Sequence, residues 1–303
     1  MSSGSGSTKV ILIAMMANLT IALAKFIGAY VSKSSALLAE AIHSVVDTTN
    51  QVLLLLGEKA SKKKPDDAHP LGYGRETFFW SFVVTILLFS LGGLFAIYEG
   101  IHKLEDPQPL HHPILAVGIL GFSILLEGYS FYACLKEIRR KNPFHNLWTW
   151  FRKTTTAGLL VIFTEDAGAL IGLMIATVCV SLSWALDNPA FDAYGSILIG
   201  CLLVGLAVLL AREIKSLIIG ESPSKNYRPH IESLVRSHIP NSQVLRFLAL
   251  QTGDGEVMIS FKITPGNIKE VSKLIQTINQ IEDQIRTQFP EIKWQFVEPD
   301  IQD

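Results

Sequence analysis

The sequence of 303 residues contains little charge for its length. Lys, Arg, Asp and Glu make up 17% of it, against about 25% in an ordinary soluble domain. The sequence has 26 basic and 27 acidic residues, so its formal net charge is −1. A chain with this balance has no overall attraction to nucleic acid. These shortages exclude a typical soluble protein, and we expect no nucleic-acid partner.

Cysteine is also scarce. The three cysteines, Cys134, Cys179 and Cys201, all lie in apolar runs and form no C-x-x-C pair. This pattern argues against a disulfide framework and against a thiolate zinc site. We predict instead that the three thiols are buried and pack as small apolar groups.

Apolar residues, by contrast, are abundant before about residue 220. They occur in runs of roughly 20 residues, the length of a helix that crosses a bilayer. The sequence therefore predicts an α-helical membrane protein with six transmembrane helices over residues 1–220. A small soluble α+β domain should follow over residues 221–303. The predicted spans are Val10–Val31, Ser35–Leu56, Phe78–Ile101, Ile114–Leu135, Thr156–Trp184 and Ala193–Ile219.

Basic residues gather in alternate loops. The loop after the second span contains Lys59, Lys62, Lys63, Lys64 and Arg75, and the loop after the fourth contains Lys136, Arg139, Arg140, Lys141, Arg152 and Lys153. Basic loops tend to stay in the cytoplasm. With six spans, both termini and the soluble domain should lie on that side. We expect a multi-pass protein of the cell membrane, in particular of a bacterial cytoplasmic membrane.

The second span carries polar residues that a lipid-facing helix would not need. A charged side chain at mid-bilayer costs roughly 2.5–3.5 kcal/mol on insertion scales, so it usually serves a function. His43 and Asp47 are four residues apart and share one helix face. An imidazole and a carboxylate there supply half of a tetrahedral metal site. Asn50 and Glu40, one turn to either side, could support the site or relay protons. A simple His–Asp hydrogen bond that ties two helices together is the alternative.

Two adjacent carboxylates, Glu165 and Asp166, interrupt the fifth span in "VIFTEDAGALIG". Neighbouring helical residues point about 100° apart, so only one of the pair can aim squarely at a shared site. Glu127 in the fourth span could act as a relay, a structural partner or a gate. Lys25 and Asp192 lie near predicted span ends, where we expect solvation or snorkelling of their charges.

The soluble tail reads as helix, strand, strand, helix and strand. The helices are expected at 225–237 and 267–289, and the strands at 244–251, 256–264 and 293–297. A Gly-Asp-Gly turn joins the first two strands. This order suits a small ferredoxin-like domain.

Several stretches resemble the cation diffusion facilitator family of metal transporters. "SSALLAEAIHSVVDTTNQ" is similar to its second-span signature, and "DDAHPLGYGRETFFWSF" to the following loop and third span. "DAYGSILIGCLL" and "LIIGES" resemble the sixth span and its exit. The third span, "LGGLFAIYEGIHKLEDPQP", is similar to the subgroup that includes zinc transporter 9. The resemblance covers nearly the whole chain.

This resemblance implies a homodimer that exports a divalent metal from the cytoplasm in exchange for protons. It assigns His43 and Asp47 as metal ligands from the second span, and Asp166 from the fifth. Ile162 stands where the family often has a fourth ligand, so Glu165 or water would complete the shell. One imidazole with several carboxylates makes a harder site, which keeps manganese, iron, cobalt and nickel open besides zinc.

Two further regions match the family only in part. Asp66 and His69 fit a weak metal site in the loop after the second span, but Tyr73 stands where another histidine would be. A plain solvated turn is the alternative. The tail has only His230 and His238, so we favour dimerisation over metal sensing there.

The sequence thus predicts a proton-coupled antiporter that exports zinc. An exporter specific for manganese, iron, cobalt or nickel, or a membrane metal sensor that does not transport, are the alternatives. A channel is a third, disfavoured because a tight site releases ions slowly. We expect no enzyme, since no further catalytic group accompanies the site, and no cofactor beyond the transported metal.

Overall fold

A computed structural model describes the backbone of residues 4–141 and 146–302, and the side chains from residue 18 onward within those ranges, up to residue 140 in the first. The chain divides into two compact units. The helical unit comprises residues 1–57, 80–150 and 158–214, and the second unit comprises residues 58–79, 151–157 and 215–303. The domain division predicted after residue 220 stays a prediction. The N-terminus, predicted to be cytoplasmic, lies outside the described residues.

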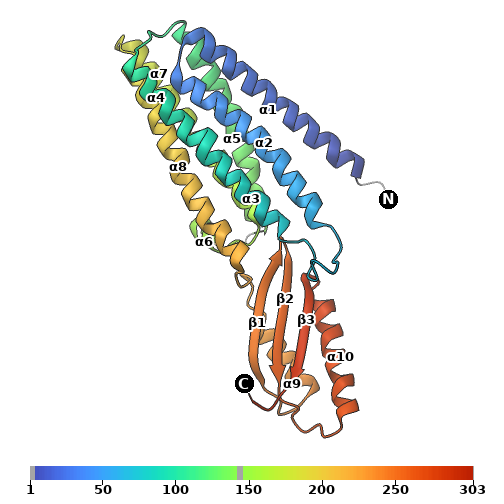
Figure 1. Ribbon diagram of the computed structural model, residues 1–303. Helices are drawn as coiled ribbons and strands as arrows, with labels where there is room; N and C mark the ends of the chain where they lie inside the picture. Colours follow the sequence, from blue (N-terminus) through green and yellow to red (C-terminus); the bar gives the residue numbers. More distant parts are fainter. Residues whose placement is uncertain (1–3, 142–145, 303) are drawn as a thin grey trace. The chain divides into compact units, whose positions relative to one another are not determined.

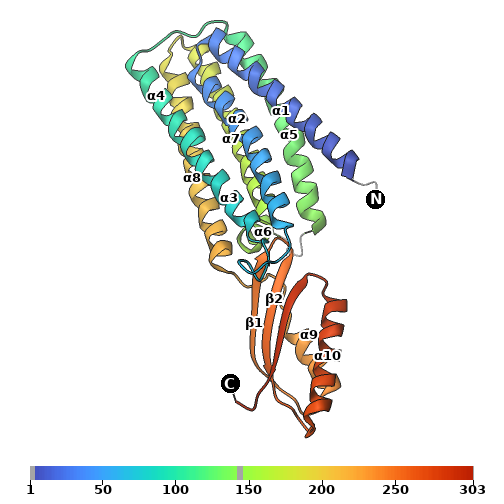
Figure 2. The same cartoon turned by 45° about the vertical axis from the view of Figure 1, so that its right-hand side comes forward.

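Helices occupy all six predicted spans (Figure 1). Five of them exceed the predicted range by a few residues, and the fifth-span helix is shifted by one residue; a short helix, α6 (Leu147–Lys153), precedes it. Figure 2 shows the long helices running along roughly one direction. They are α1 (Gly4–Ser32), α2 (Ser35–Ser61), α3 (Glu76–Leu87) continued by a π-helical turn (Leu88–Leu94) and α4 (Phe95–Glu105), α5 (Pro113–Lys141), α7 (Ala157–Ala185) and α8 (Ala190–Ile219). The fold class predicted from the sequence is confirmed.

Four of these helical stretches are long and apolar enough to cross a membrane: Glu76–Glu105, Pro113–Arg140, Ala157–Ala185 and Ala190–Ile219. The described side chains of α1 give a shorter apolar helix, Asn18–Ser32. Helix α2 is nearly as long as the others but buries a row of polar side chains. Its polarity is the feature that the functional site must explain.

Small residues let the spans approach closely, as their composition predicts. A side chain at Gly93 or Gly100 would collide with α8, and one at Gly200 would collide with Ile97 and the carbonyl of Gly93. Span three and α8 therefore pack backbone against backbone. The shared core of the helical unit includes Ala29, Ala36, Leu120, Leu173 and Leu203, which come from α1, α2, α5, α7 and α8.

The cysteine prediction is only partly right. Cys134 and Cys179 are buried free thiols, but Cys201 is exposed on α8. An apolar run predicts a span and not which of its faces packs against protein, so the exposure of Cys201 was not accessible to sequence reasoning.

The C-terminal part has the predicted order of elements. It contains α9 (Arg228–His238), β1 (Val244–Gly253), β2 (Glu256–Ile263), α10 (Val271–Gln288) and β3 (Ile292–Pro299). Strand β2 is central, antiparallel to β1 and parallel to β3. Ile231, Ile259, Ile263, Ile281 and Ile285 are fully buried between the sheet and the two helices. Gly255, at a φ of +69°, closes the turn between β1 and β2.

Candidate metal site

Helix α2 presents His43 and Asp47 on one face, one turn apart. The Ser34 side chain accepts a hydrogen bond from the Leu37 N–H at 3.0 Å and so caps the start of the helix. His43 is 1% exposed and Asp47 16% exposed, and 3.6 Å separates His43 Nδ1 from Asp47 Oδ1. The predicted pair is therefore present as a close, largely buried imidazole and carboxylate.

Several polar atoms of this face have no hydrogen-bond partner among the described residues. Both ring nitrogens of His43, Oδ1 of Asp47, Oδ1 of Asn50 and Oε1 of Glu40 are buried and unpaired. Leaving such an atom unsatisfied costs about 1–3 kcal/mol, and buried polar groups are nearly always paired. A row of unpaired nitrogen and oxygen atoms along one helix face fits a ligand that the chain itself does not supply.

The adjacent carboxylates of α7 point in different directions. Glu165 is 5% exposed, and its Oε1 accepts a hydrogen bond from Asn50 Nδ2 at 2.5 Å. Asp166 accepts one from the Ser130 hydroxyl of α5 at 3.2 Å. The structure thus directs Glu165 toward α2 and Asp166 toward α5. This divergence follows from their neighbouring positions on one helix.

These acidic groups share one electrostatic neighbourhood. Asp47 interacts electrostatically with both Glu165 and Asp166. Glu127 of α5 interacts in the same way with His43, Asp47 and Asp166. Within the described residues, however, no three His, Cys, Asp or Glu side chains close into a group that could hold a metal ion. Ile162, at the position where the family often has a fourth ligand, is 38% exposed. The predicted ligand set of His43, Asp47, Glu165 and Asp166 stays a prediction.

Glu40 has a partner that was not predicted from the sequence. The Lys25 ammonium of α1 lies 3.4 Å from Glu40 Oε2, and neither side chain has any exposed surface. Lys25 also donates a hydrogen bond to the Ser44 hydroxyl at 2.7 Å. The expectation that Lys25 snorkels is wrong. The pair could have been predicted, because a carboxylate within a span needs a nearby cation and Lys25 is a basic residue within the first span.

Asp192 was also expected to be solvated, and it is fully buried instead. Its carboxylate accepts hydrogen bonds from the Ser34 hydroxyl at 2.6 Å and from the Ser35 N–H at 2.7 Å. The Ser35 hydroxyl and the Ala36 N–H add bonds of 3.1 and 3.3 Å, and Lys103 Nζ of α4 adds one of 2.9 Å. Asp192 therefore joins the start of α8, the start of α2 and the end of α4.

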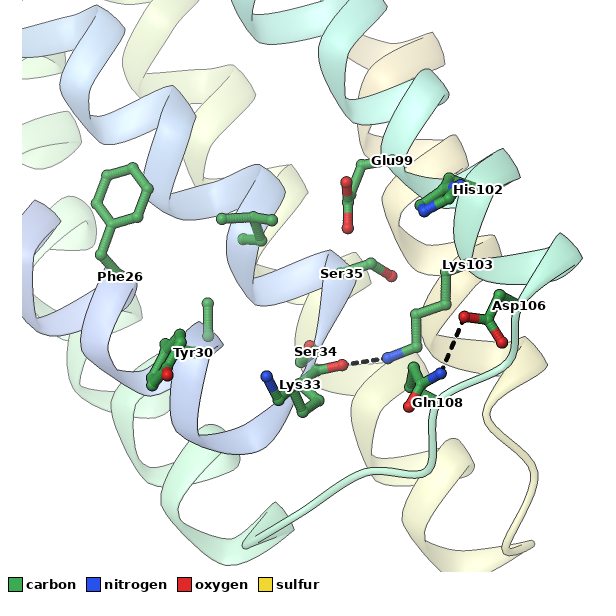
Figure 3. Close-up of a pocket in the computed structure, with 12 residues that line it drawn as sticks. Phe26, Tyr30, Lys33, Ser34, Ser35, Glu99, His102, Lys103, Asp106 and Gln108 are labelled. Atoms are coloured by element: carbon green, nitrogen blue, oxygen red, sulfur yellow. Dashed lines mark hydrogen bonds between the residues drawn. The ribbon is translucent and has the colours of Figure 1, made fainter.

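Figure 3 shows a pocket of about 340 Å³ beside this joint. The Lys103 side chain reaches across it and donates to the backbone carbonyl of Lys33. Glu99, His102 and Asp106 of α4 and its C-terminal end face the same pocket. Of the described residues that line the pocket, none is a predicted metal ligand.

The loop candidates Asp66 and His69 form a local turn. Asp66 Oδ1 accepts hydrogen bonds from the Ala68 and His69 N–H groups at 3.1 and 2.7 Å. Its other oxygen accepts the Tyr73 hydroxyl at 2.7 Å. His69 Nδ1 lies 3.6 Å from Asp66 Oδ1. The Asp66 carboxylate is thus engaged within the turn, and a weak metal site at this pair stays a prediction.

The hydrogen bonds of this turn predict a measurable change in the pKa of Asp66. The hydrogen bond from the Tyr73 hydroxyl, followed by that from the His69 N–H, lowers the pKa of Asp66. The carboxylate therefore favours the folded turn above its ordinary pKa, and this contribution is lost as the pH falls through the lower, folded value. Tyr73→Phe should raise the pKa of Asp66 toward its ordinary range. Carboxyl NMR of the protein labelled at aspartate would measure it, and identical titration of Asp66 in both proteins would contradict the assignment.

The two histidines of the C-terminal part make local contacts. His238 Nδ1 lies 3.0 Å from the Leu234 carbonyl, and the His230 ring packs edge-on against Phe289 with centroids 5.9 Å apart. Both sit on α9, as the sequence indicates, and neither is drawn into an acidic cluster in the described residues.

Comparison with known proteins adds to this geometry. A family model for the cation efflux transmembrane domain matches residues 11–219. Metal tolerance protein C4 of Arabidopsis thaliana is 30% identical over 220 residues, which are 71% of this chain and 48% of that protein. The human mitochondrial proton-coupled zinc antiporter SLC30A9 is 30% identical over 219 residues, 72% of this chain and 39% of that protein.

A bacterial relative is matched over more of its length. Zinc transporter ZitB of Pectobacterium atrosepticum is 27% identical over 256 residues, which are 84% of this chain and 75% of that protein. The chain spans less than half the length of the plant and human relatives.

Proposed function

The chain belongs to the cation efflux family of metal transporters, also called cation diffusion facilitators, and from this premise we propose that it exports zinc from the cytoplasm in exchange for protons. The observation that carries the proposal is the buried face of α2, where both nitrogens of His43 and one oxygen of Asp47 lack partners among the described residues. A divalent cation would satisfy the Asp47 oxygen and one nitrogen of His43, whose other nitrogen carries the ring proton of the neutral imidazole. The names of two relatives, a proton-coupled zinc antiporter and a zinc transporter, support zinc.

Proton coupling follows from the chemistry of the donors. A metal binds the neutral imidazole and the ionised carboxylate, so loading the site displaces protons. An unperturbed imidazole changes charge between about pH 5 and 8, within reach of physiological gradients. When the site opens to the other side, protons compete with the metal for His43 and Asp47. The reprotonated site then returns, which completes one exchange.

The carboxylates of α7 would complete the coordination. Glu165 already reaches α2 through Asn50, and Asp166 lies in the same electrostatic neighbourhood as Asp47. A rotation or slide of α7 against α2 would bring one or both to the ion. Glu127 would serve as a proton relay on the α5 side. We further propose a homodimer in a bacterial cytoplasmic membrane, with both termini in the cytoplasm.

Donors of this kind also accept other metals. Imidazole and carboxylate without thiolate suit manganese, iron, cobalt and nickel as well as zinc. The test must therefore compare metals side by side. A membrane sensor that binds metal without transporting it is the main alternative to transport, ahead of a channel.

Reconstitution in vesicles tests the proposal. The purified protein is placed in proteoliposomes that contain a pH-sensitive dye, and zinc, manganese, iron, cobalt and cadmium are added in turn. We expect zinc to drive proton movement at a rate that saturates with its concentration. If another metal gives the largest flux, the specificity is wrong. If folded protein binds zinc but no metal moves protons, the sensor alternative replaces the exchanger.

A further inference from the structure

Lys25 is a buried cation that the exchange cycle above does not use. Its side chain has no exposed surface, and it lies two turns before the end of α1, a helix within the cation efflux transmembrane domain. Removing an ammonium from water costs several kcal/mol unless it is paired. Among the described residues it contacts Glu40, at 3.4 Å, and the Ser44 hydroxyl, at 2.7 Å. Both partners lie on α2.

This ammonium lies next to the proposed metal site. Ser44 directly follows His43 and is one turn before Asp47, and Glu40 is one turn before His43. Lys25 also acts electrostatically on Glu40, His43 and Asp47. The cation thus faces the same stretch of α2 that would receive a divalent metal.

Glu40 is held in a fixed position by this contact. One carboxylate oxygen faces Lys25. The other, Oε1, fills the space that a side chain at Gly172 of α7 would need, and it has no hydrogen-bond partner among the described residues. An oxygen in this state is a competent metal donor. The ion pair with Lys25 directs the Glu40 carboxylate toward α1, while the Glu40 backbone stays one helical turn before His43.

We propose that Lys25 is a positioning residue that holds Glu40 out of the metal's coordination shell and offsets one carboxylate charge, so that the bound ion remains releasable. The inference rests on the proposed function and names a device within the same site. Its physical basis is the number of acidic groups around α2. A resident cation would offset part of their negative charge, which otherwise favours a bound divalent ion and slows its release: Glu40, Asp47, Glu127, Glu165 and Asp166.

The test compares zinc affinity and zinc transport in four proteins: wild type, Lys25→Met, Glu40→Gln and the double variant. Removing one nearby positive charge should lower the Kd for zinc by at least about tenfold, because a +1 and a +2 charge repel strongly at the effective dielectric of protein sites. Lys25→Met should also transport more slowly, because release slows. Glu40→Gln should bind more weakly, since it leaves the ammonium uncompensated. The double variant should shift the Kd back toward the wild-type value.

Lys103→Met is the matched control. Lys103 is another buried lysine paired with a carboxylate, Asp192, and its hydrogen bonds in the described part of the chain go to Asp192 and the Lys33 carbonyl, away from the proposed site. It should lose stability without tightening zinc binding. If Lys25→Met does not fold, the charge-neutral double variant and Lys25→Arg remain informative, since Lys25→Arg keeps the charge and should keep the Kd near the wild-type value.

The outcomes separate this inference from the function on which it rests. An unchanged Kd in Lys25→Met, or the same tightening in Lys103→Met, overturns the inference while wild-type transport still stands. Wild type that binds zinc without transporting it overturns the exchanger, and the binding measurements still decide the role of Lys25. Wild type that binds no zinc overturns both.

Discussion

Replacing Asp47 with alanine should abolish zinc-driven proton movement in reconstituted vesicles, with a loss of roughly 100-fold or more. Even partners that only orient a metal ligand cost about 10–100-fold when they are removed, and Asp47 is proposed as a ligand itself. Its carboxylate lies 3.6 Å from the His43 ring on the buried face of α2. Without it, α2 offers a single imidazole, which binds zinc weakly and displaces fewer protons.

The experiment measures the initial rate of internal pH change after zinc is added. Glu105→Ala is the matched control, because it removes an exposed carboxylate at the end of α4 and should transport like wild type. Size-exclusion profiles and thermal stability confirm that Asp47→Ala is folded. Transport by Asp47→Ala at more than about a tenth of the wild-type rate would exclude Asp47 from the site, since a lost ligand should cost more than this.

The same vesicles decide between the two carboxylates of α7. Glu165 contacts α2 through Asn50, whereas Asp166 contacts Ser130 of α5. The family resemblance assigns Asp166 as the ligand. Comparing Glu165→Gln with Asp166→Asn separates the two, because only the variant that removes a ligand should weaken zinc binding as well as transport.

The second large effect concerns stability. Asp192→Ala should lower the free energy of unfolding by about 3–5 kcal/mol, the usual cost of removing one partner of a buried ion pair. The substitution leaves the Lys103 ammonium and the Ser35 and Ala36 N–H groups buried without their acceptor. It also removes the hydrogen bonds that connect the starts of α2 and α8 to the end of α4. Unfolding of the purified protein in detergent micelles, followed by circular dichroism, measures the loss.

Asp106→Ala provides the comparison for this measurement. Asp106 follows the end of α4, is exposed, and accepts a bond from the Gln108 side chain at 3.0 Å. Exposed substitutions usually change stability by no more than about 0.5 kcal/mol. If Asp192→Ala melts like Asp106→Ala, the joint between α2, α4 and α8 does not stabilise the helical unit.

Much of the fold was predictable because lipid leaves the backbone few choices. In a bilayer, backbone polar groups must be paired within the segment, so an apolar run of about 20 residues becomes a helix. Each of the six predicted spans coincides with a helix, and the tail has its predicted order of helices and strands. The family resemblance drawn from the second-span and third-span motifs is confirmed over residues 11–219.

By itself, the sequence determined the relations that lie within one element. His43 and Asp47 share a face because they are four residues apart, and Glu165 and Asp166 diverge because they are adjacent. Both follow from 3.6 residues per turn in any α-helix. No knowledge of neighbouring helices is needed for either.

Only the tertiary structure decided which helices supply the partners. That Lys25 pairs with Glu40, and Asp192 with Ser34, Ser35 and Lys103, depends on how each helix is rotated about its axis. Close packing at small residues such as Gly172 and Gly100 sets that rotation. This rotation places Lys25 and Asp192, which were expected near solvated span ends, in the interior. A pattern along one chain segment cannot specify a rotation that two packed surfaces fix together.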